Sequence, residues 1–168
     1  MTSMAAGQLA VVRLRQLTVR VLVALVAQFV IGMFVNLFVT IPDSHPGSQP
    51  ADYFSGSFQS VVWALGSGLP LLVAHVVLGL ILAVGSLLVV VRARALRRRR
   101  LTVAAVLGVL FIVAAGFNGA SFLDFAHNIS SLLMALLALA AVGCYATALM
   151  RLGAASPSPG SQIAGPAQ

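Results

Sequence analysis

Two histidines in apolar surroundings are the residues of this sequence best suited to chemistry. His75 lies in GLPLLVAHVVLGLILAVGS, residues 68–86, a stretch without a charged residue. His127 lies in DFAHNISSL, where another long apolar run begins. A charged imidazole is costly in hydrocarbon, so we expect each ring to be neutral and either hydrogen-bonded or bound to a metal.

The runs that carry these residues are long enough to cross a membrane. The chain has 168 residues, of which 60% are hydrophobic and 8% are charged. About 20 apolar residues cross a ~30 Å hydrocarbon core as a helix. Four runs meet this length, at 21–40, 70–91, 101–120 and 125–150. We therefore predict an all-α polytopic membrane protein with a four-helix transmembrane domain over 21–151, an N-terminal segment over 1–20 and a disordered tail over 152–168.

Charge is distributed unequally between the two sides of this predicted domain. All ten basic residues are arginines, and they precede the first run, join the second to the third, or follow the fourth: Arg13, Arg15, Arg20, Arg92, Arg94, Arg97, Arg98, Arg99, Arg100 and Arg151. The three acids, Asp43, Asp52 and Asp124, fall on the other side. The positive-inside rule then predicts cytoplasmic N and C termini in a multi-pass protein of the plasma membrane, or of a bacterial-type inner membrane. We expect Arg92–Arg100 to bind anionic lipid headgroups, and no nucleic acid.

The outer loop 41–69 changes character halfway. Its first half is rich in Pro, Ser and Gly, and we expect His45 there to be a solvated loop residue. Its second half repeats apolar residues at helical spacing: Phe54, Phe58, Val61, Val62 and Leu65. Capped by Asp52, it is predicted to form a short amphipathic helix at the outer interface, with Tyr53 and Trp63 at headgroup level. A partly ordered loop along the bilayer is the alternative.

The two halves of the transmembrane domain share a pattern. Asn36 and Asn118 lie near the outer ends of the first and third runs, and Ala-His pairs at His75 and His127 lie near the outer starts of the second and fourth. At ~1.5 Å per residue from the nearest arginine, the asparagines and His75 lie at about 24 to 27 Å, and His127 at about 36 Å. We predict a bundle of two related helical hairpins that face each other.

Small and polar residues on one stripe of each helix should turn both histidines inward. Neutral imidazole is the commonest axial ligand of heme iron. His75 and His127 on facing helices would therefore make a b-type heme site, in which Asn36, Asn118 and Ser131 orient the ring nitrogens or meet the propionates.

The stretch VLGVLFIVAAGFNGASFLDFAHNISSLLMALLALA, residues 106–140, and the two histidine positions carry a family resemblance. The layout resembles one four-helix half of heme A synthase and small bis-histidine membrane proteins of the cytochrome b type. This resemblance implies that His75 and His127 are paired ligands of heme b, for electron transfer or heme handling. No Glu precedes His75 in its helix, no Arg follows it directly and the outer loop has no cysteine pair. We therefore do not expect the chain to be an enzyme on its own.

The competing interpretation is an accessory or assembly subunit of a membrane complex. Intramembrane His, Asn and Gln often only hydrogen-bond between helices, at about 0.6 kcal/mol per contact. Transport or a non-heme metal is a further alternative, although no carboxylate or arginine lies within a predicted span. Asp124, the acid nearest a histidine in sequence, is expected to cap the fourth helix.

Overall fold

The computed structural model describes residues 2–125 and 127–153, and within them the chain is helical apart from its connections. The helices are α1 (Thr2–Phe38), α2 (Tyr53–Gly66), α3 (Pro70–Ala95), α4 (Arg99–Phe125) and α5 (Asn128–Gly153). From residue 154 onward, the tail that is predicted to be disordered lies outside the described part of the chain. The segment 1–20 is helical from Thr2 and continuous with α1, in keeping with the high helix propensity of its Leu, Arg, Gln and Ala residues.

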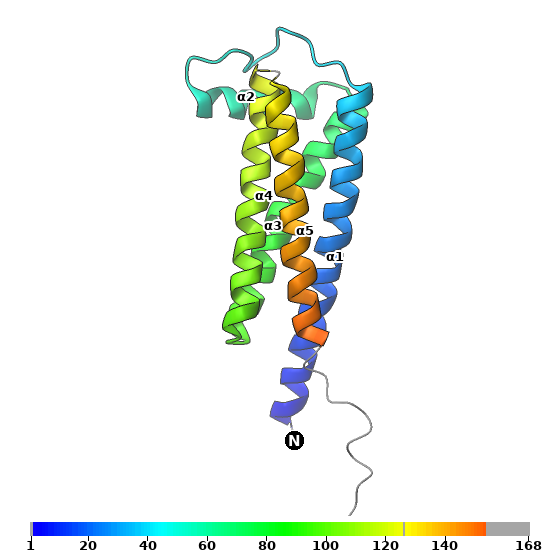
Figure 1. The fold of residues 1–168 in the computed structure, drawn as a ribbon, viewed down its shortest axis with the longest axis vertical. Coiled ribbons are helices and arrows are strands. Elements are labelled where there is room, and N and C mark those ends of the chain that lie inside the picture. The colour runs from blue at the N-terminus through cyan, green and yellow to red at the C-terminus, as the bar shows by residue number, and fades with distance from the viewer. Residues whose placement is uncertain (1, 126, 154–168) are drawn as a thin grey trace, which may run out of the picture.

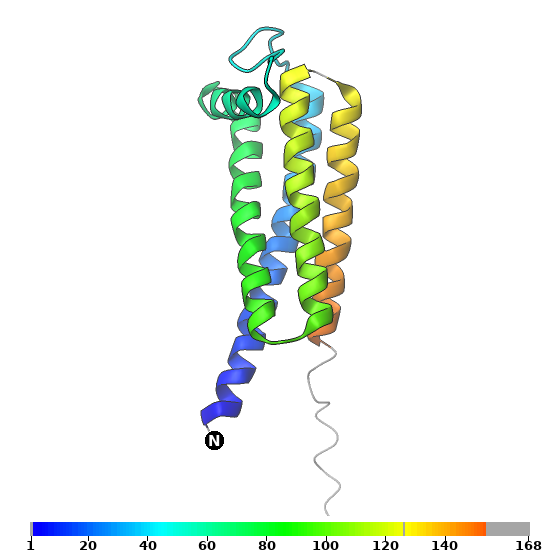
Figure 2. The same ribbon diagram turned by 90° about the vertical axis from the view of Figure 1, so that its left-hand side faces the viewer.

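Four helices of the described chain, α1, α3, α4 and α5, are long and apolar enough to cross a membrane, which confirms the prediction of four long apolar helices. They lie side by side (Figures 1 and 2), and both α1 and α4 pack against α3 and α5. The start of α1, the turn from α3 to α4 and the end of α5 lie at one end of the bundle (Figure 2). We call this the arginine end, and the opposite end, which carries α2, the capped end.

The outward surfaces of these helices are apolar along their length. Large hydrophobic side chains are exposed on every long helix, among them Val23, Ile81, Leu110 and Leu132, all more than half exposed. A water-soluble domain of this size rarely exposes so much contiguous hydrocarbon. Lipid is therefore the medium that suits this surface, and the helical backbone satisfies its own polar groups there.

Toward the arginine end, the core of the bundle is packed closely around Tyr145. Its side chain is fully buried together with Leu14, Val89 and Leu152. Gly108 of α4 faces the ring, and a Cβ atom placed on Gly108 would lie only 2.6 Å from Tyr145 Cε2. Because Gly108 has no side chain, α4 and α5 can pack closely with the Tyr145 ring between them.

Helix α2 lies across the capped end, roughly perpendicular to the long helices (Figures 1 and 2). Asp52 caps it, because its Oδ2 accepts a hydrogen bond of 2.7 Å from the backbone N–H of Ser55. The helix and its cap confirm the sequence prediction. Phe54 and Phe58 are about 70% exposed, whereas the residues that α2 buries are small: Gly56, Ser57, Ser60 and Ala64. The helix thus turns its small face to the protein and its apolar face to the exterior.

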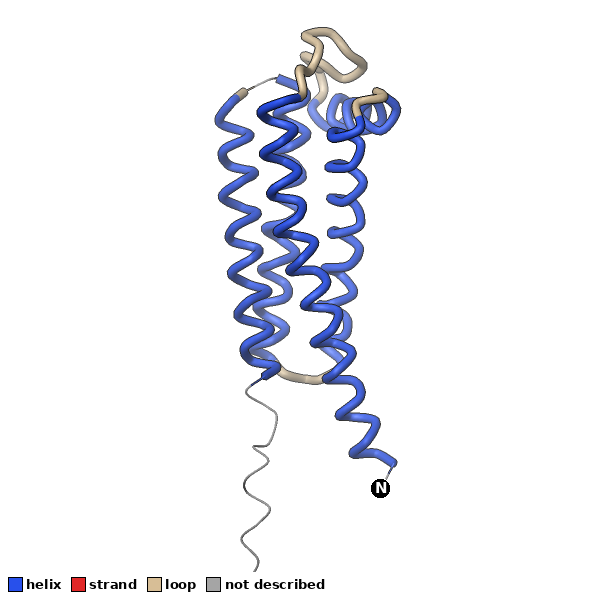
Figure 3. Tube along the Cα trace, turned by 90° about the vertical axis from the view of Figure 1, so that its right-hand side faces the viewer, coloured by secondary structure: helices blue, strands red, loops and turns tan. Residues whose placement is uncertain are grey.

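The loop before α2 returns over the end of α4 (Figure 3), and this changes the environment of His45. The His45 imidazole stacks on Trp63 with 4.2 Å between ring centroids, and its Nε2 lies 3.1 Å from the carbonyl oxygen of Leu123. His45 is therefore a half-buried loop residue: its place in the loop is as predicted, but it is only partly solvated. The sequence could not show these contacts, because the partners lie 18 and 78 residues further along the chain.

Asp124 also differs from its predicted role as a cap of α5. It lies in the last turn of α4 and is only 1% exposed. Its Oδ2 accepts a 2.8 Å hydrogen bond from the Ser57 hydroxyl, and its backbone oxygen accepts one of 2.9 Å from Gln49 N–H. Asp124 therefore fastens α2 and the preceding loop to the bundle.

Candidate functional site

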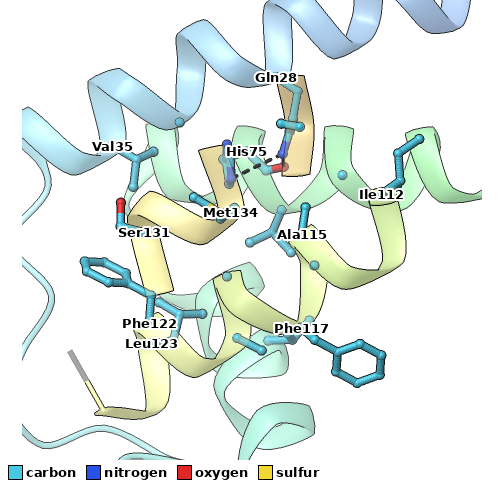
Figure 4. A pocket seen from close by; sticks show the side chains of 18 of the residues that line it. Gln28, Val35, His75, Ile112, Ala115, Phe117, Phe122, Leu123, Ser131 and Met134 are labelled. Carbon is cyan, nitrogen blue, oxygen red and sulfur yellow. Dashed lines mark hydrogen bonds between the residues drawn. The ribbon is translucent and has the colours of Figure 1, made fainter. Parts of the chain in front are cut away.

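A cavity of about 490 Å³ lies between the four long helices, on the α2 side of the Tyr145 core. Residues from all five helices line it, and its walls are mostly apolar (Figure 4). The space exists because each long helix contributes residues with little or no side chain: Gly32, Gly79, Ala83, Ala115, Gly119 and Ala138. A volume of this size is in the range of small-molecule and cofactor sites.

His75 of α3 is the titratable residue on this wall, and its ring points toward α1 (Figure 4). Gln28 Nε2 donates to the backbone oxygen of His75 at 3.0 Å and lies 3.2 Å from its Nε2. Gly32 leaves room for the imidazole, because a Cβ atom there would lie 2.9 Å from Cε1. Gln28 and Gly32 thus hold the ring at the cavity wall.

Gln28 is a functional candidate that the predicted site residues did not include. The signal was present in the sequence, since Gln28, Gly32 and Asn36 are spaced four residues apart and so share one face of α1. The sequence could not show that the face contacts His75, because the two residues are 47 positions apart.

Two polar atoms at the cavity are buried without a hydrogen-bond partner among the described residues. They are His75 Nδ1 and Gln28 Oε1. Leaving a buried donor or acceptor unpaired costs about 1 to 3 kcal/mol, so such atoms are normally satisfied by protein, water or ligand. Both atoms are covered by protein, so a ligand or water in the cavity could satisfy them only after a small movement of the side chains.

The predicted site residues divide into two groups. His75, Asn36 and Ser131 line the cavity, and Ser131 donates a 3.3 Å hydrogen bond to Asn36 Oδ1 between α5 and α1. Asn118 donates instead to the backbone oxygen of Ala114 in its own helix, at 2.9 Å. His127 is exposed before the start of α5, where its ring stacks on Phe125 with centroids 5.8 Å apart. Neither belongs to the described cavity wall.

The structure therefore brings one of the two intramembrane histidines to the cavity. Pairing His75 with His127 on a single heme stays a prediction, and it requires the connection around residue 127 to bring that imidazole inward. The structure describes residues 2–125 and 127–153. Among these residues, no group of three or more His, Cys, Asp or Glu side chains could hold a metal ion.

The cavity lies close to the apolar exterior where α2, α3 and α4 meet. Side chains of all three helices line the cavity and are also exposed on the surface, namely Phe58 at 72%, Leu80 at 52% and Phe117 at 46%. These side chains therefore separate the cavity from the outer surface of the bundle.

Comparisons with known proteins give no further guide to this site: no family model, no curated protein and no solved structure matches the chain.

Proposed function

We propose that this chain is a multi-pass plasma-membrane protein that binds a largely apolar small molecule in the cavity between its helices. The four apolar helices support the membrane assignment. The observation that carries the ligand proposal is the apolar cavity itself, and beside it two covered atoms, His75 Nδ1 and Gln28 Oε1, have no hydrogen-bond partner among the described residues. The ligand then has an apolar body and a polar group that hydrogen-bonds at His75, and it enters from the bilayer.

Heme b, for electron transfer or heme handling, is the particular ligand that the sequence predicts. His75 fits one position on the iron, since it is a buried imidazole with a free ring nitrogen beside small residues. Asn36 and Ser131 supply polar groups on the same wall. The described arrangement does not supply the second imidazole. When bound, heme would provide one-electron transfer, and this chain would bind and orient it.

The second candidate is an accessory or assembly subunit without a ligand. The Gln28–His75 and Ser131–Asn36 hydrogen bonds favour it, because they join α1 to α3 and to α5 as packing contacts. Such contacts contribute about 0.6 kcal/mol each in membrane bundles, which is sufficient for this role.

The deciding experiment is analysis of the detergent-purified protein for bound molecules. We expect Ala115→Leu, which narrows the cavity, to lose the molecule that the wild type retains, as detected by absorption and by mass spectrometry of an organic extract. Ala114→Leu is the matched control, because this neighbouring alanine is not among the described lining residues. The dithionite-reduced minus oxidised spectrum identifies heme.

Each outcome selects one interpretation. An α band lost in both His75→Ala and His127→Ala would support the paired heme site, and a band lost only in His75→Ala would support heme with a different second ligand. A colourless protein whose extracted molecule disappears in Ala115→Leu would support a different apolar ligand. Wild-type protein that is colourless and carries no molecule would contradict ligand binding and leave the accessory role.

We further propose that both termini are cytoplasmic and that the capped end faces outward. What supports this orientation is the charge distribution, with all ten arginines toward the arginine end and the three acids toward the capped end. In a Cys144→Ser background, we expect Ser48→Cys to react with an impermeant maleimide in intact cells. Arg97→Cys should react only after the membrane is opened, and the reverse pattern would disprove the orientation.

A further inference from the structure

A second hollow lies between α4 and α5 at the arginine end, and it shares no lining residue with the cavity beside His75. It has a volume of about 740 Å³ and opens on the surface of the bundle. Its walls come from one face of each helix, because the lining residues of α4 and of α5 recur at helical spacing. We call it the α4–α5 groove.

The groove has two chemically different halves. Three arginines line its end, Arg99 and Arg100 from the start of α4 and Arg151 from the last turn of α5, and all three are exposed. Toward the middle of the bundle the lining becomes apolar, with Val103, Leu107, Ala140 and Gly143. Leu107 lies seven residues beyond Arg100, about 10 Å along the helix.

No acidic side chain of the described residues lies at the arginine end, where the groove is. All three carboxylate side chains, Asp43, Asp52 and Asp124, belong to the capped end of the described structure. Thr147 lines the groove but donates its hydroxyl to the backbone oxygen of Gly143 at 2.8 Å, so the guanidinium groups are the charged donors available. Guanidinium matches phosphate geometry and can form two parallel hydrogen bonds with it.

We propose that the α4–α5 groove is a binding site for one anionic phospholipid. The phosphate lies among Arg99, Arg100 and Arg151, and an acyl chain runs along the apolar half. An anionic headgroup fits the unneutralised charge, and a hydrocarbon chain fits the adjoining wall, which a water-soluble anion would leave uncovered. Basic pockets between transmembrane helices on the cytoplasmic side are known to bind such headgroups. This inference is independent of the ligand proposed for the other cavity.

Binding in the groove differs from attraction of lipid to the arginine-rich turn as a whole. The lipid contacts Arg99 and Arg100 of that turn and Arg151 of α5. Arg92, Arg94, Arg97 and Arg98 do not line the groove and make no contact with it. A pair of matched charge variants therefore separates the specific site from general electrostatics.

The test is a titration of the protein in neutral detergent with phosphatidylglycerol or phosphatidylcholine of identical chains, read by native mass spectrometry. We expect one phosphatidylglycerol to bind in preference to phosphatidylcholine. Arg100→Gln with Arg151→Gln should weaken phosphatidylglycerol binding by about 30-fold, from about 1 kcal/mol per arginine. Arg94→Gln with Arg98→Gln removes the same charge at the same end and should leave the affinity nearly unchanged.

A second variant tests the apolar half without altering charge. No atom lies within 4 Å of a Cβ placed on Gly143, so Gly143→Leu should fold and fill the groove. We expect it to weaken phosphatidylglycerol binding, and we expect excess glycerophosphate not to displace the lipid.

Four results would overturn the proposal. Equal weakening by the two arginine pairs would mean diffuse electrostatic attraction. Unchanged binding in Gly143→Leu, or displacement by glycerophosphate, would mean that the groove takes a phosphate anion rather than a lipid. The absence of any preference for phosphatidylglycerol would mean that the groove is no anionic site.

Discussion

Replacing Gly108 with alanine is expected to destabilise the protein by about 1 to 3 kcal/mol, the usual cost of an added carbon in a filled core. The new Cβ would lie 2.6 Å from Tyr145 Cε2 and 2.8 Å from Cζ. The ring is rigid and fully buried, so it cannot turn away into the surrounding medium. The α4–α5 pair must therefore separate, which a titration of unfolding with SDS in mixed micelles would measure.

The same helix provides a matched control for this variant. Gly116 has no neighbouring atom within 4 Å of a Cβ position, so Gly116→Ala should be neutral or stabilising by up to about 1 kcal/mol through helix propensity. A smaller side chain at position 145 should relieve the clash in Gly108→Ala. We therefore expect Tyr145→Leu to lower the free energy of unfolding less in the Gly108→Ala background than in the wild type. Equal stability of the two glycine variants would show that the contact between Gly108 and Tyr145 is loose.

Removal of the Ser57 hydroxyl is expected to release α2 from the capped end. Asp124 Oδ2 accepts its 2.8 Å bond from Ser57, and Oδ1 is buried without a partner among the described residues. In Ser57→Ala the carboxyl group would be left without a side-chain donor, at a cost of about 1 to 3 kcal/mol. Hydrogen exchange of the α2 amides should rise by one to two orders of magnitude, which corresponds to that free energy when α2 opens locally.

Two further variants test whether Asp124 is the cause. Ser55→Ala removes an exposed hydroxyl from the same helix and should leave exchange of α2 nearly unchanged. Replacing both partners, as Ser57→Ala with Asp124→Leu, should restore much of the protection, because neither partner of the lost hydrogen bond then leaves a buried polar group unpaired. Fast exchange that persists in this double variant would argue against the proposed cause.

The sequence by itself determined the membrane-spanning helices, the short helix α2 and the unequal distribution of charge. These features follow from local rules. An apolar run of about 20 residues forms a helix in any bilayer, and Asp52 caps α2 through residues that directly follow it. The sequence also predicted one site for His75, His127, Asn36, Asn118 and Ser131, of which His75, Asn36 and Ser131 line the cavity and the other two do not.

The tertiary structure decided which polar groups meet. Gln28 contacts His75 across 47 residues and Ser57 contacts Asp124 across 67, and no periodicity within one helix specifies such pairs. His75 and His127 carry the same Ala-His signature, yet one ring faces a cavity and the other stacks on Phe125 at a helix boundary. His75 lies within α3, whereas His127 precedes Asn128, the first residue of α5, so the point at which each helix begins makes this difference.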